Sequence, residues 1–176
     1  MREKINIPYH EMRNGFKNQV RNSSLRRGMN PLLFLMKKAK NHILQLLALY
    51  CPINSLRVKM HRLRGVNIGE NVFIGLNCVL DHAYPEYIYL EDGCGLNGDV
   101  YIIAHTNPNK SYQDYFEAYV APVVIGKHAW IGIRSTILPG VRVGENSVVS
   151  AGVVVSKDVQ PDTLVASAKN RIIKYR

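Results

Sequence analysis

Three residues of this sequence carry side chains suited to acid–base chemistry and stand where the pattern of the chain changes. His105 lies in the stretch YIIAHTNP, residues 101–108, where a series of regularly spaced aliphatic residues stops and a polar, tyrosine-rich segment begins. Asp81 and His82 lie earlier, in the stretch LDHAYPEY. A neutral imidazole can accept a proton from a hydroxyl group near neutral pH, and a carboxylate can orient that imidazole. Whether these side chains meet depends on the elements that carry them.

An aliphatic residue recurs every six positions from Ile68 onward, with two interruptions, one near Pro85 and a longer one after Ile102. A six-residue period matches neither an α-helix nor a simple alternating strand. It is typical of a parallel β-helix, in which three short strands make each coil of about 18 residues. The twelve hexads predict a mainly β fold of about four coils, and they begin at Ile68, Ile74, Leu80, Leu90, Leu96, Ile102, Ile125, Ile131, Ile137, Val143, Val149 and Val155.

The same spacing predicts where the three polar residues lie. Leu80 and Ile102 each begin the third hexad of a coil, so they should stack in neighbouring coils about 4.8 Å apart. Asp81 and His82 then lie roughly one coil below His105, near the same edge. We therefore expect the three side chains to converge where an excursion loop, residues 106–122, leaves the β-helix.

The chain before the repeat has a different character. Residues 1–64 contain 14 Lys and Arg against Glu3 and Glu11, whereas the rest of the chain has 9 Lys and Arg against 11 Asp and Glu. Asn30 and Pro31 are typical of a helix start, and Cys51-Pro52 of a helix end. We expect a basic, partly helical appendage, with one amphipathic helix or two short ones. Such a helix could cover the first coil, or it could dock on an anionic membrane surface.

Composition narrows the class of protein. No run of about 18 apolar residues is long enough for a transmembrane helix, and the first residues lack the apolar core of a signal peptide. The three cysteines, Cys51, Cys78 and Cys94, form no CxxC pair, which favours a reducing cytoplasm. His82, His105 and His128 could suggest a zinc hydratase, but the HxxxxH pair of that class is missing, so we expect no metal. No nucleic-acid recognition module is visible.

Two stretches resemble a known family. The segment WIGIRSTILPGVRVGENSVVSAGVVVSKDVQP is similar to the C-terminal coils of hexapeptide-repeat acetyltransferases, in particular maltose and galactoside O-acetyltransferases. LDHAYPEYI resembles the branch that modifies capsules and lipopolysaccharides. The resemblance implies a left-handed β-helix over residues 65–160, a homotrimer, and acetyl-CoA in a groove between neighbouring subunits. It implies a carbohydrate hydroxyl as acceptor, in surface-polysaccharide synthesis. The cysteines and the basic appendage, rather than the resemblance, favour a cytoplasmic enzyme that can lie against the inner face of the membrane.

The resemblance also assigns roles. His105 matches the family's catalytic base, and Asp81 and His82 are the further catalytic candidates. Residues 161–176 would close the cofactor groove, although SAKNR at Ser167–Arg171 replaces the usual GNPA(K/R). The positions that match cofactor contacts are Trp130, Gly132, Ile133, Ala151, Ser156, Lys157, Arg171 and Lys174. The residues that we expect at the acceptor are Asn77, Asn97, Tyr112 and Tyr115.

Two other functions stay open at this point. VNIGENVFIGLNCVLDHA also aligns with the serine acetyltransferases, in which the histidine of DHA is catalytic. In that family an aspartate precedes the motif by a fixed spacing, and Asn67 occupies its position here. The other possibility is a non-catalytic scaffold that uses the basic appendage to bind a membrane or another polyanion.

Overall fold

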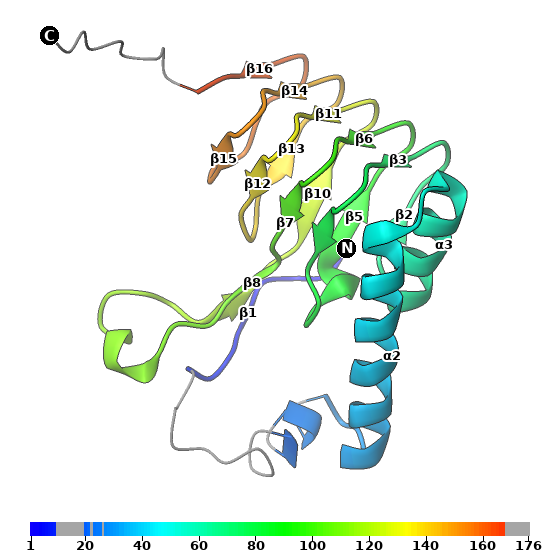
Figure 1. Ribbon diagram of the computed structural model, residues 1–176. Coiled ribbons are helices and arrows are strands. Elements are labelled where there is room, and N and C mark those ends of the chain that lie inside the picture. The colour runs from blue at the N-terminus through cyan, green and yellow to red at the C-terminus, as the bar shows by residue number, and fades with distance from the viewer. Residues whose placement is uncertain (10–19, 22, 26, 168–176) are drawn as a thin grey trace, which may run out of the picture.

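The computed structural model describes residues 1–9, 20–21, 23–25 and 27–167 of the chain. Short parallel strands form three sheets that enclose a prism, and two helices lie across one end of it (Figure 1). The fold is therefore mainly β with parallel sheets, which confirms the prediction from the six-residue repeat.

Successive strands of the repeat enter the three sheets in turn, so each sheet collects every third strand. The first sheet contains β2 (Asn67–Ile68), β5 (Ile88–Leu90), β10 (Val123–Ile125) and β13 (Arg142–Val143). The second contains β3 (Phe73–Ile74), β6 (Gly95–Leu96), β11 (Trp130–Ile131), β14 (Val148–Val149) and β16 (Leu164–Val165). The third contains β4 (Val79–Leu80), β7 (Tyr101–Ile102), β12 (Thr136–Ile137) and β15 (Val154–Val155).

The aliphatic residues of the repeat form stacked rows inside the prism. In the third sheet Leu80 pairs with Ile102, which pairs in turn with Ile137, and each of these residues is 0% exposed. Burying such a side chain contributes about 1.5–3 kcal/mol, so these rows supply most of the hydrophobic stabilisation of the prism. The predicted stacking of third hexads in neighbouring coils is confirmed.

Tight turns join the sheets at the corners of the prism. Asparagine and aspartate tolerate the left-handed backbone region better than most residues, which explains their frequency at these turns. The described non-glycine residues with positive φ are Asn71, Asn77, Asp99, His128, Arg134, Asn146 and Asp162. The four-residue interruption near Pro85 forms a short 3-10 helix, η1 (Pro85–Tyr87), directly before β5.

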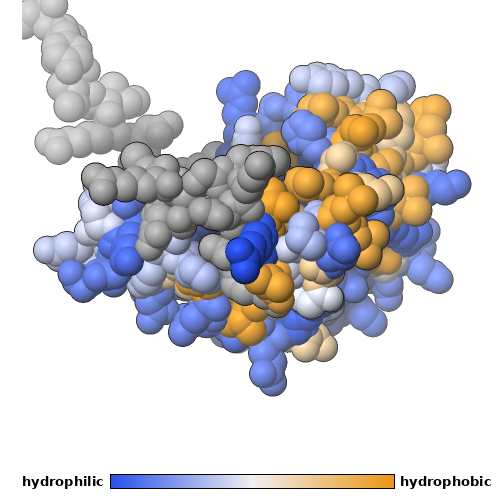
Figure 2. Space-filling model, turned by 90° about the horizontal axis from the view of Figure 1, so that it is seen from below, coloured by the Kyte–Doolittle hydropathy of each residue, from blue (hydrophilic) through white to orange (hydrophobic). Residues whose placement is uncertain are grey.

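Two helices precede the prism. Helix α2 (Pro31–Tyr50) begins after Asn30, whose side chain accepts a hydrogen bond from Leu32 N at 2.8 Å, and it ends at Cys51, as the sequence predicts. Helix α3 (Asn54–Arg64) was not expected, and it ends at Gly65 in the left-handed conformation. Neither α2 nor any other helix among the described residues is long and apolar enough to cross a membrane. Apolar side chains gather in patches on the face seen in Figure 2, with hydrophilic side chains between and around them.

The helices supply hydrogen bonds to the open edge of the first coil. Strands at the end of a β-helix present unpaired backbone groups, and a buried unpaired carbonyl is costly. Arg57 of α3 donates to the Ile74 carbonyl at 2.7 Å, and Gln45 of α2 donates to the Cys78 carbonyl at 3.1 Å. Asn54 both accepts from Ile74 N and donates to the Val72 carbonyl. Polar side chains, rather than an apolar stripe, therefore close this end of the prism.

A small antiparallel sheet stands at the mouth of the excursion. Strand β8 (His105–Thr106) pairs with β9 (Tyr119–Val120), and between them lies a 3-10 helix, η2 (Lys110–Tyr112), in a segment that projects from the prism (Figure 1). Strand β1 (Ile5–Asn6) adds to the outer side of β9, and Lys4 and Glu117 form an exposed ion pair at 2.8 Å. The first residues of the chain thus pack on the excursion, which the sequence did not indicate.

We expect Arg57→Met to lower the free energy of unfolding by about 1.5–3 kcal/mol, because it leaves one buried and one partly buried carbonyl without their charged donor. Those carbonyls are Ile74 O and Cys51 O. Urea denaturation at a fixed protein concentration measures the change. Lys59→Met is the matched control on the same helix, since Lys59 is exposed. Equal stability of the two variants would contradict the capping role of Arg57.

Candidate active site

Asp81 and His105 form the central pair of the site. Asp81 directly follows β4, and His105 begins β8 shortly after β7. Because β4 and β7 are parallel neighbours in register, the residues that follow them lie at the same edge of the third sheet. His105 Nδ1 lies 2.5 Å from Asp81 Oδ2. The structure thus brings together the two groups that coil stacking predicts should meet.

The Asp81 carboxylate is held by four hydrogen bonds. Oδ1 accepts from Ala83 N at 2.8 Å and Tyr84 N at 3.0 Å, while Oδ2 accepts from Ala104 N at 2.8 Å and from His105. Burial alone would raise the pKa of Asp81, but the hydrogen bond and charge of His105, together with the backbone donors, hold that pKa below its ordinary value. An ionised carboxylate only accepts hydrogen bonds, so His105 Nδ1 is the donor in this contact. In the neutral imidazole this leaves Nε2 as the nitrogen with the free lone pair.

Helix α3 supports this pair from behind. Arg64 is buried and donates from Nη2 to the Leu80 carbonyl at 2.9 Å and to the Asp81 carbonyl at 3.1 Å. Burial lowers the pKa of Arg64 to about 10, with the charge of Asp81 acting in the opposite direction. Arg64 Nη1 lies 2.8 Å from His61 Nδ1. Burial, followed by the charges of Arg64 and Arg57, lowers the pKa of His61 to about 3, so His61 is neutral and accepts this bond.

Arg64 and His61 were not expected from the sequence as part of the site. Both fall in the basic segment before the repeat, where a cation is ordinarily a solvated surface residue. The available signal was their spacing, since residues three apart on a helix share one face. That signal becomes informative only when α3 itself is recognised.

His82 lies beside the pair without joining it. Its ring centroid is 6.2 Å from that of His105, in an edge-on arrangement. Partial burial lowers the pKa of His82, and the negative charge of Asp81 offsets this only in part. Tyr84 covers another side of the His105 ring at a centroid distance of 5.2 Å. The carboxylate of Asp81 therefore orients His105, and the neighbouring rings partly enclose it.

Several other residues expected at the site lie on the two edges of the third sheet. Asn77 and Asn97 follow β3 and β6, at the corner that leads into this sheet. Ile133 and Ala151 follow β11 and β14 at the same corner, where a Cβ atom on Gly132 would lie 2.6 Å from Ala151 N. These four positions thus form one column along the prism.

The opposite edge of the third sheet carries a second column. Asp81 and His105 follow β4 and β7, and Ser156 and Lys157, both exposed, follow β15 at the same corner two coils farther on. The outer face of the third sheet lies between the two columns. The residues of the two columns therefore border a single face.

Trp130 and the tyrosines lie outside these columns. Trp130 is 42% exposed on the second sheet, stacks on Phe73 with ring centroids 6.2 Å apart, and covers Gly95, where a Cβ atom would lie 2.4 Å from its ring. Tyr112 and Tyr115 are 54% and 80% exposed on the excursion. Arg171 and Lys174 lie outside the described residues.

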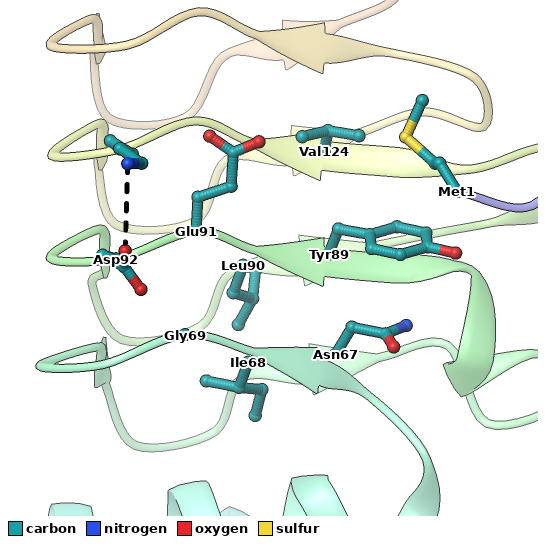
Figure 3. Close-up of a pocket in the computed structure, with 10 residues that line it drawn as sticks. Met1, Asn67, Ile68, Gly69, Tyr89, Leu90, Glu91, Asp92 and Val124 are labelled. Carbon is teal, nitrogen blue, oxygen red and sulfur yellow. Dashed lines mark ion pairs between the residues drawn. The ribbon is translucent and has the colours of Figure 1, made fainter.

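A separate hollow of about 540 Å³ lies on the first sheet (Figure 3). Met1 lies over it, and Arg2 N donates to Tyr89 Oη at 2.9 Å. Its charged residues are already paired, Asp92 with Lys127 at 4.0 Å and Glu91 with Arg142 at 3.2 Å. It does not contain Asp81 or His105, so we do not assign the reaction to it. No group of three His, Cys, Asp or Glu residues able to hold a metal ion occurs in the described part of the chain.

Comparison with known proteins identifies the family. A family model described as "Hexapeptide repeat of succinyl-transferase" matches residues 65–104 and 122–157, on either side of the excursion. The chain is 32% identical over 140 residues to the putative acetyltransferase YvoF of Bacillus subtilis, and the match covers 78% of this chain and 77% of that protein. The chain belongs to the hexapeptide-repeat acetyltransferases.

Two more comparisons extend this finding. This hexapeptide-repeat acetyltransferase is 30% identical over 110 residues to the galactoside O-acetyltransferase of Escherichia coli; the match covers 62% of the chain but only 53% of that protein. Its fold is similar to that of the hexapeptide-repeat acetyltransferase VCA0836 of Vibrio cholerae, solved with acetyl coenzyme A. The TM-score is 0.57 and the identity 24%, over 80% of this chain and 87% of the other.

We expect the stability of the protein to fall as the pH drops from about 6.5 towards 3, because His61 must bind a proton when the chain unfolds. Its pKa is about 3 when folded and 6.5 when free, so the stabilisation is present above pH 6.5 and is lost below it. The expected slope is about 1.4 kcal/mol per pH unit in this range. His61→Gln keeps an acceptor for Arg64 and should flatten the slope, whereas the exposed control His42→Gln should not. Equal slopes in urea denaturation would contradict the buried, neutral state of His61.

Proposed function

We propose that the protein is an acetyl-CoA-dependent O-acetyltransferase that uses His105 as its general base and a carbohydrate hydroxyl as its acceptor. The observation that carries this proposal is the Asp81–His105 pair, with Nδ1 bound to a buried carboxylate at 2.5 Å. A sugar hydroxyl is a weak nucleophile until a base accepts its proton. The pair supplies such a base in a fixed orientation.

The proposed reaction is a direct transfer. The acceptor hydroxyl oxygen attacks the carbonyl carbon of the thioester while His105 Nε2 takes the hydroxyl proton. The imidazolium that forms is stabilised by the ionised Asp81. The carbon–sulfur bond then breaks, the thiolate leaves as CoA with the proton from His105, and no acyl-enzyme forms. Backbone N–H groups would stabilise the oxyanion.

The two columns of residues bordering the third sheet support a shared cofactor groove. We propose a left-handed β-helix of about four coils that assembles as a homotrimer, with acetyl-CoA between the prisms of neighbouring subunits. Trp130, Gly132, Ile133 and Ala151 would contact the cofactor along its length. The cations Lys157, Arg171 and Lys174, with Ser156, would bind its phosphates, because charge-assisted hydrogen bonds favour such groups. The complex of VCA0836 with acetyl coenzyme A agrees with this choice of donor.

The acceptor is the less defined part of the proposal. The similarity to a galactoside O-acetyltransferase supports a carbohydrate, and we propose a sugar of surface-polysaccharide synthesis, acetylated in the cytoplasm. Tyr112 and Tyr115 are exposed aromatic residues on the excursion that begins at His105, and they suit stacking on a sugar ring. Asn77 and Asn97 would hydrogen-bond hydroxyl groups from the opposite edge.

We also propose three functional parts of the chain. Residues 65–160 form the catalytic β-helix, with the excursion at 106–122, and residues 161–176 form a tail that closes the cofactor groove. Residues 1–64 form the appendage. Both ends of this appendage contact the catalytic part: β1 pairs with β9, and Arg64 donates a hydrogen bond to the Asp81 carbonyl.

We expect His105→Ala to reduce acetyl transfer by about 10²–10⁴-fold, because the acceptor hydroxyl loses its base. The affinity for acetyl-CoA should hardly change, since the cofactor positions are elsewhere. Steady-state kinetics with acetyl-CoA and a panel of glycans gives the rate, and calorimetric titration with CoA gives the affinity.

L-serine belongs in the acceptor panel of that experiment. The matched control is His82→Ala. It should retain most of the activity, because the Asp81 carboxylate binds His105 instead. Loss of activity in His82→Ala with full activity in His105→Ala would favour the chemistry of a serine acetyltransferase. No turnover of acetyl-CoA with any acceptor, and no CoA binding, would favour a non-catalytic scaffold.

We expect the protein to sediment as a trimer, with three times the 19.9 kDa mass of one chain. A cofactor groove bordered by two subunits requires a closed ring, and rotational symmetry is the usual way to close it. Sedimentation velocity at micromolar concentration measures the mass. A monomer with full activity would rule out the shared groove.

A further inference from the structure

Helix α2 has the reverse of the usual amphipathic arrangement. The residues that it buries are Phe34, Asn41, Gln45 and Ala48, two of them polar. The opposite face points to solvent and is apolar along its whole length. Its members, each 45–76% exposed, are Leu32, Leu33, Met36, Ile43, Leu46, Leu47 and Tyr50. At 100° per residue most of these lie directly opposite the buried set, so they form one outer stripe.

Helix α3 carries a similar stripe. Ile53, Leu56 and Leu63 are 42–54% exposed at helical spacing, and the two helices pack against each other. Figure 2, which views the molecule from below Figure 1, where α2 begins, shows apolar side chains gathered into patches. Monomeric soluble proteins rarely expose a continuous apolar surface of this kind unless it binds something. We call the exposed apolar residues of α2 and α3 the outer stripe.

Positive charge borders the outer stripe. Residues 31–64 contain seven Lys and Arg and neither Asp nor Glu. Three of the cations, Arg57, Arg62 and Arg64, donate to backbone carbonyls of the first coils. The four lysines are exposed, although Lys40 also donates to the Leu63 carbonyl at 3.0 Å and Lys38 lies over the ring of Phe34. On the helical wheel Lys40 lies at the edge of the α2 stripe, Lys37 beside that edge, and Lys38 toward the buried face. This surface is therefore apolar at its centre and cationic at its margins.

The apolar centre and cationic margins indicate what kind of surface covers the outer stripe. A second copy of the chain would bring the same unneutralised cations against one another, which costs free energy at an interface. A bilayer with anionic headgroups accepts both parts of the surface. The apolar stripe enters the boundary between headgroups and acyl chains, and the lysines extend to the phosphates. A crossing helix is not required, because such a helix lies in the plane of the surface.

We propose that the outer stripe of α2 and α3 docks the protein on a membrane surface rich in anionic phospholipid. Apolar insertion supplies the affinity, and each lysine near the headgroups contributes about 1 kcal/mol. The reversed arrangement of α2 follows from this, since one face binds the first coil and the other binds lipid.

Docking in this way places the candidate base near the membrane. Arg27 lies over the ring of Phe34 on α2 at 5.4 Å and over the ring of Tyr84 at 4.5 Å, and Tyr84 contacts His105. One helix diameter, about 10–12 Å, separates Phe34 from the outer stripe, and His105 lies beyond Phe34, through Arg27 and Tyr84. An acceptor carried by a lipid would be presented to His105 from the membrane. This consequence rests on the proposed function, whereas the docking itself does not.

Co-sedimentation of the full chain with lipid vesicles tests the docking without acetyl-CoA or acceptor. The vesicles contain phosphatidylcholine alone or with one-third phosphatidylglycerol, at low and high salt. We expect binding to the anionic vesicles that weakens as salt screens the lysines. Ile43→Ser/Leu47→Ser should lower the affinity at least about tenfold, because two apolar side chains no longer insert. Val148→Ser/Leu164→Ser, exposed on the second sheet at 39% and 66%, is the matched control and should bind normally.

A second variant separates charge from apolar insertion. Lys37→Gln/Lys59→Gln should weaken binding to anionic vesicles about 30-fold, since each lysine contributes about 1 kcal/mol, and leave any binding to neutral vesicles unchanged. Sedimentation velocity of each variant reports its oligomeric state, and circular dichroism its fold. Absence of vesicle binding, or equal binding to both vesicle types at all salt concentrations, would overturn the proposal. Dissociation of the oligomer in Ile43→Ser/Leu47→Ser, without vesicle binding by the unmodified protein, would assign the stripe to a second copy.

Discussion

The register between β4 and β7 is the constraint on which the site depends. Leu80 and Ile102 stack in neighbouring coils, both fully buried, and this fixes the residues that follow them. A change of one residue in either strand would turn an inward aliphatic side chain outward. The hydrophobic rows thus determine the 2.5 Å contact between Asp81 and His105, although neither residue belongs to a row. Positioning by a packed β scaffold is well suited to acid–base chemistry, because small displacements of a base are costly.

The buried charges around Asp81 show how the end of the prism and the site share one set of contacts. An isolated carboxylate as buried as Asp81 would be strongly destabilising, but here it accepts three backbone N–H groups and the imidazole. Arg64 stands on the other side of the same backbone and caps the Leu80 and Asp81 carbonyls. The guanidinium that closes the first coil is therefore also a buried cation bound to the backbone of the residue that carries the carboxylate. Stability of the cap and geometry of the base are coupled through Arg64.

The sequence predicted the parts of this structure that follow from periodicity. The aliphatic spacing predicted the parallel sheets and the pairing of third hexads, and through them the meeting of Asp81, His82 and His105. It did not predict α3, whose buried face is largely polar, with Arg57, His61 and Arg64 beside a single apolar residue, Val58. Hydrophobic periodicity cannot detect a helix that packs by hydrogen bonds to backbone.

The cations of the appendage have a structural role that the sequence did not indicate, because hydrogen bonds to backbone leave no periodic pattern. Arg57, Arg62 and Arg64 each donate to carbonyls of the first coils, a role that the charge pattern alone does not indicate. Strand β1 was also missed, because two residues paired with a distant excursion leave no local pattern. These features depend on where unpaired backbone groups fall in three dimensions, which one sequence does not specify.

The arrangement of α2 follows from what lies beneath it. The open edge of a coil offers carbonyls, so the inward face of a capping helix must provide donors, as Gln45 does for Cys78. Asn41 and Gln45 occupy positions that would otherwise bury leucines, and their side-chain oxygens have no hydrogen-bond partner among the described residues. Since most helices in proteins are stabilised by burying an apolar face, α2 gains less from its inner face than its 20 residues could provide. A surface that covers the outer stripe would supply the missing burial, so the cap on the first coil becomes more stable when that stripe is covered.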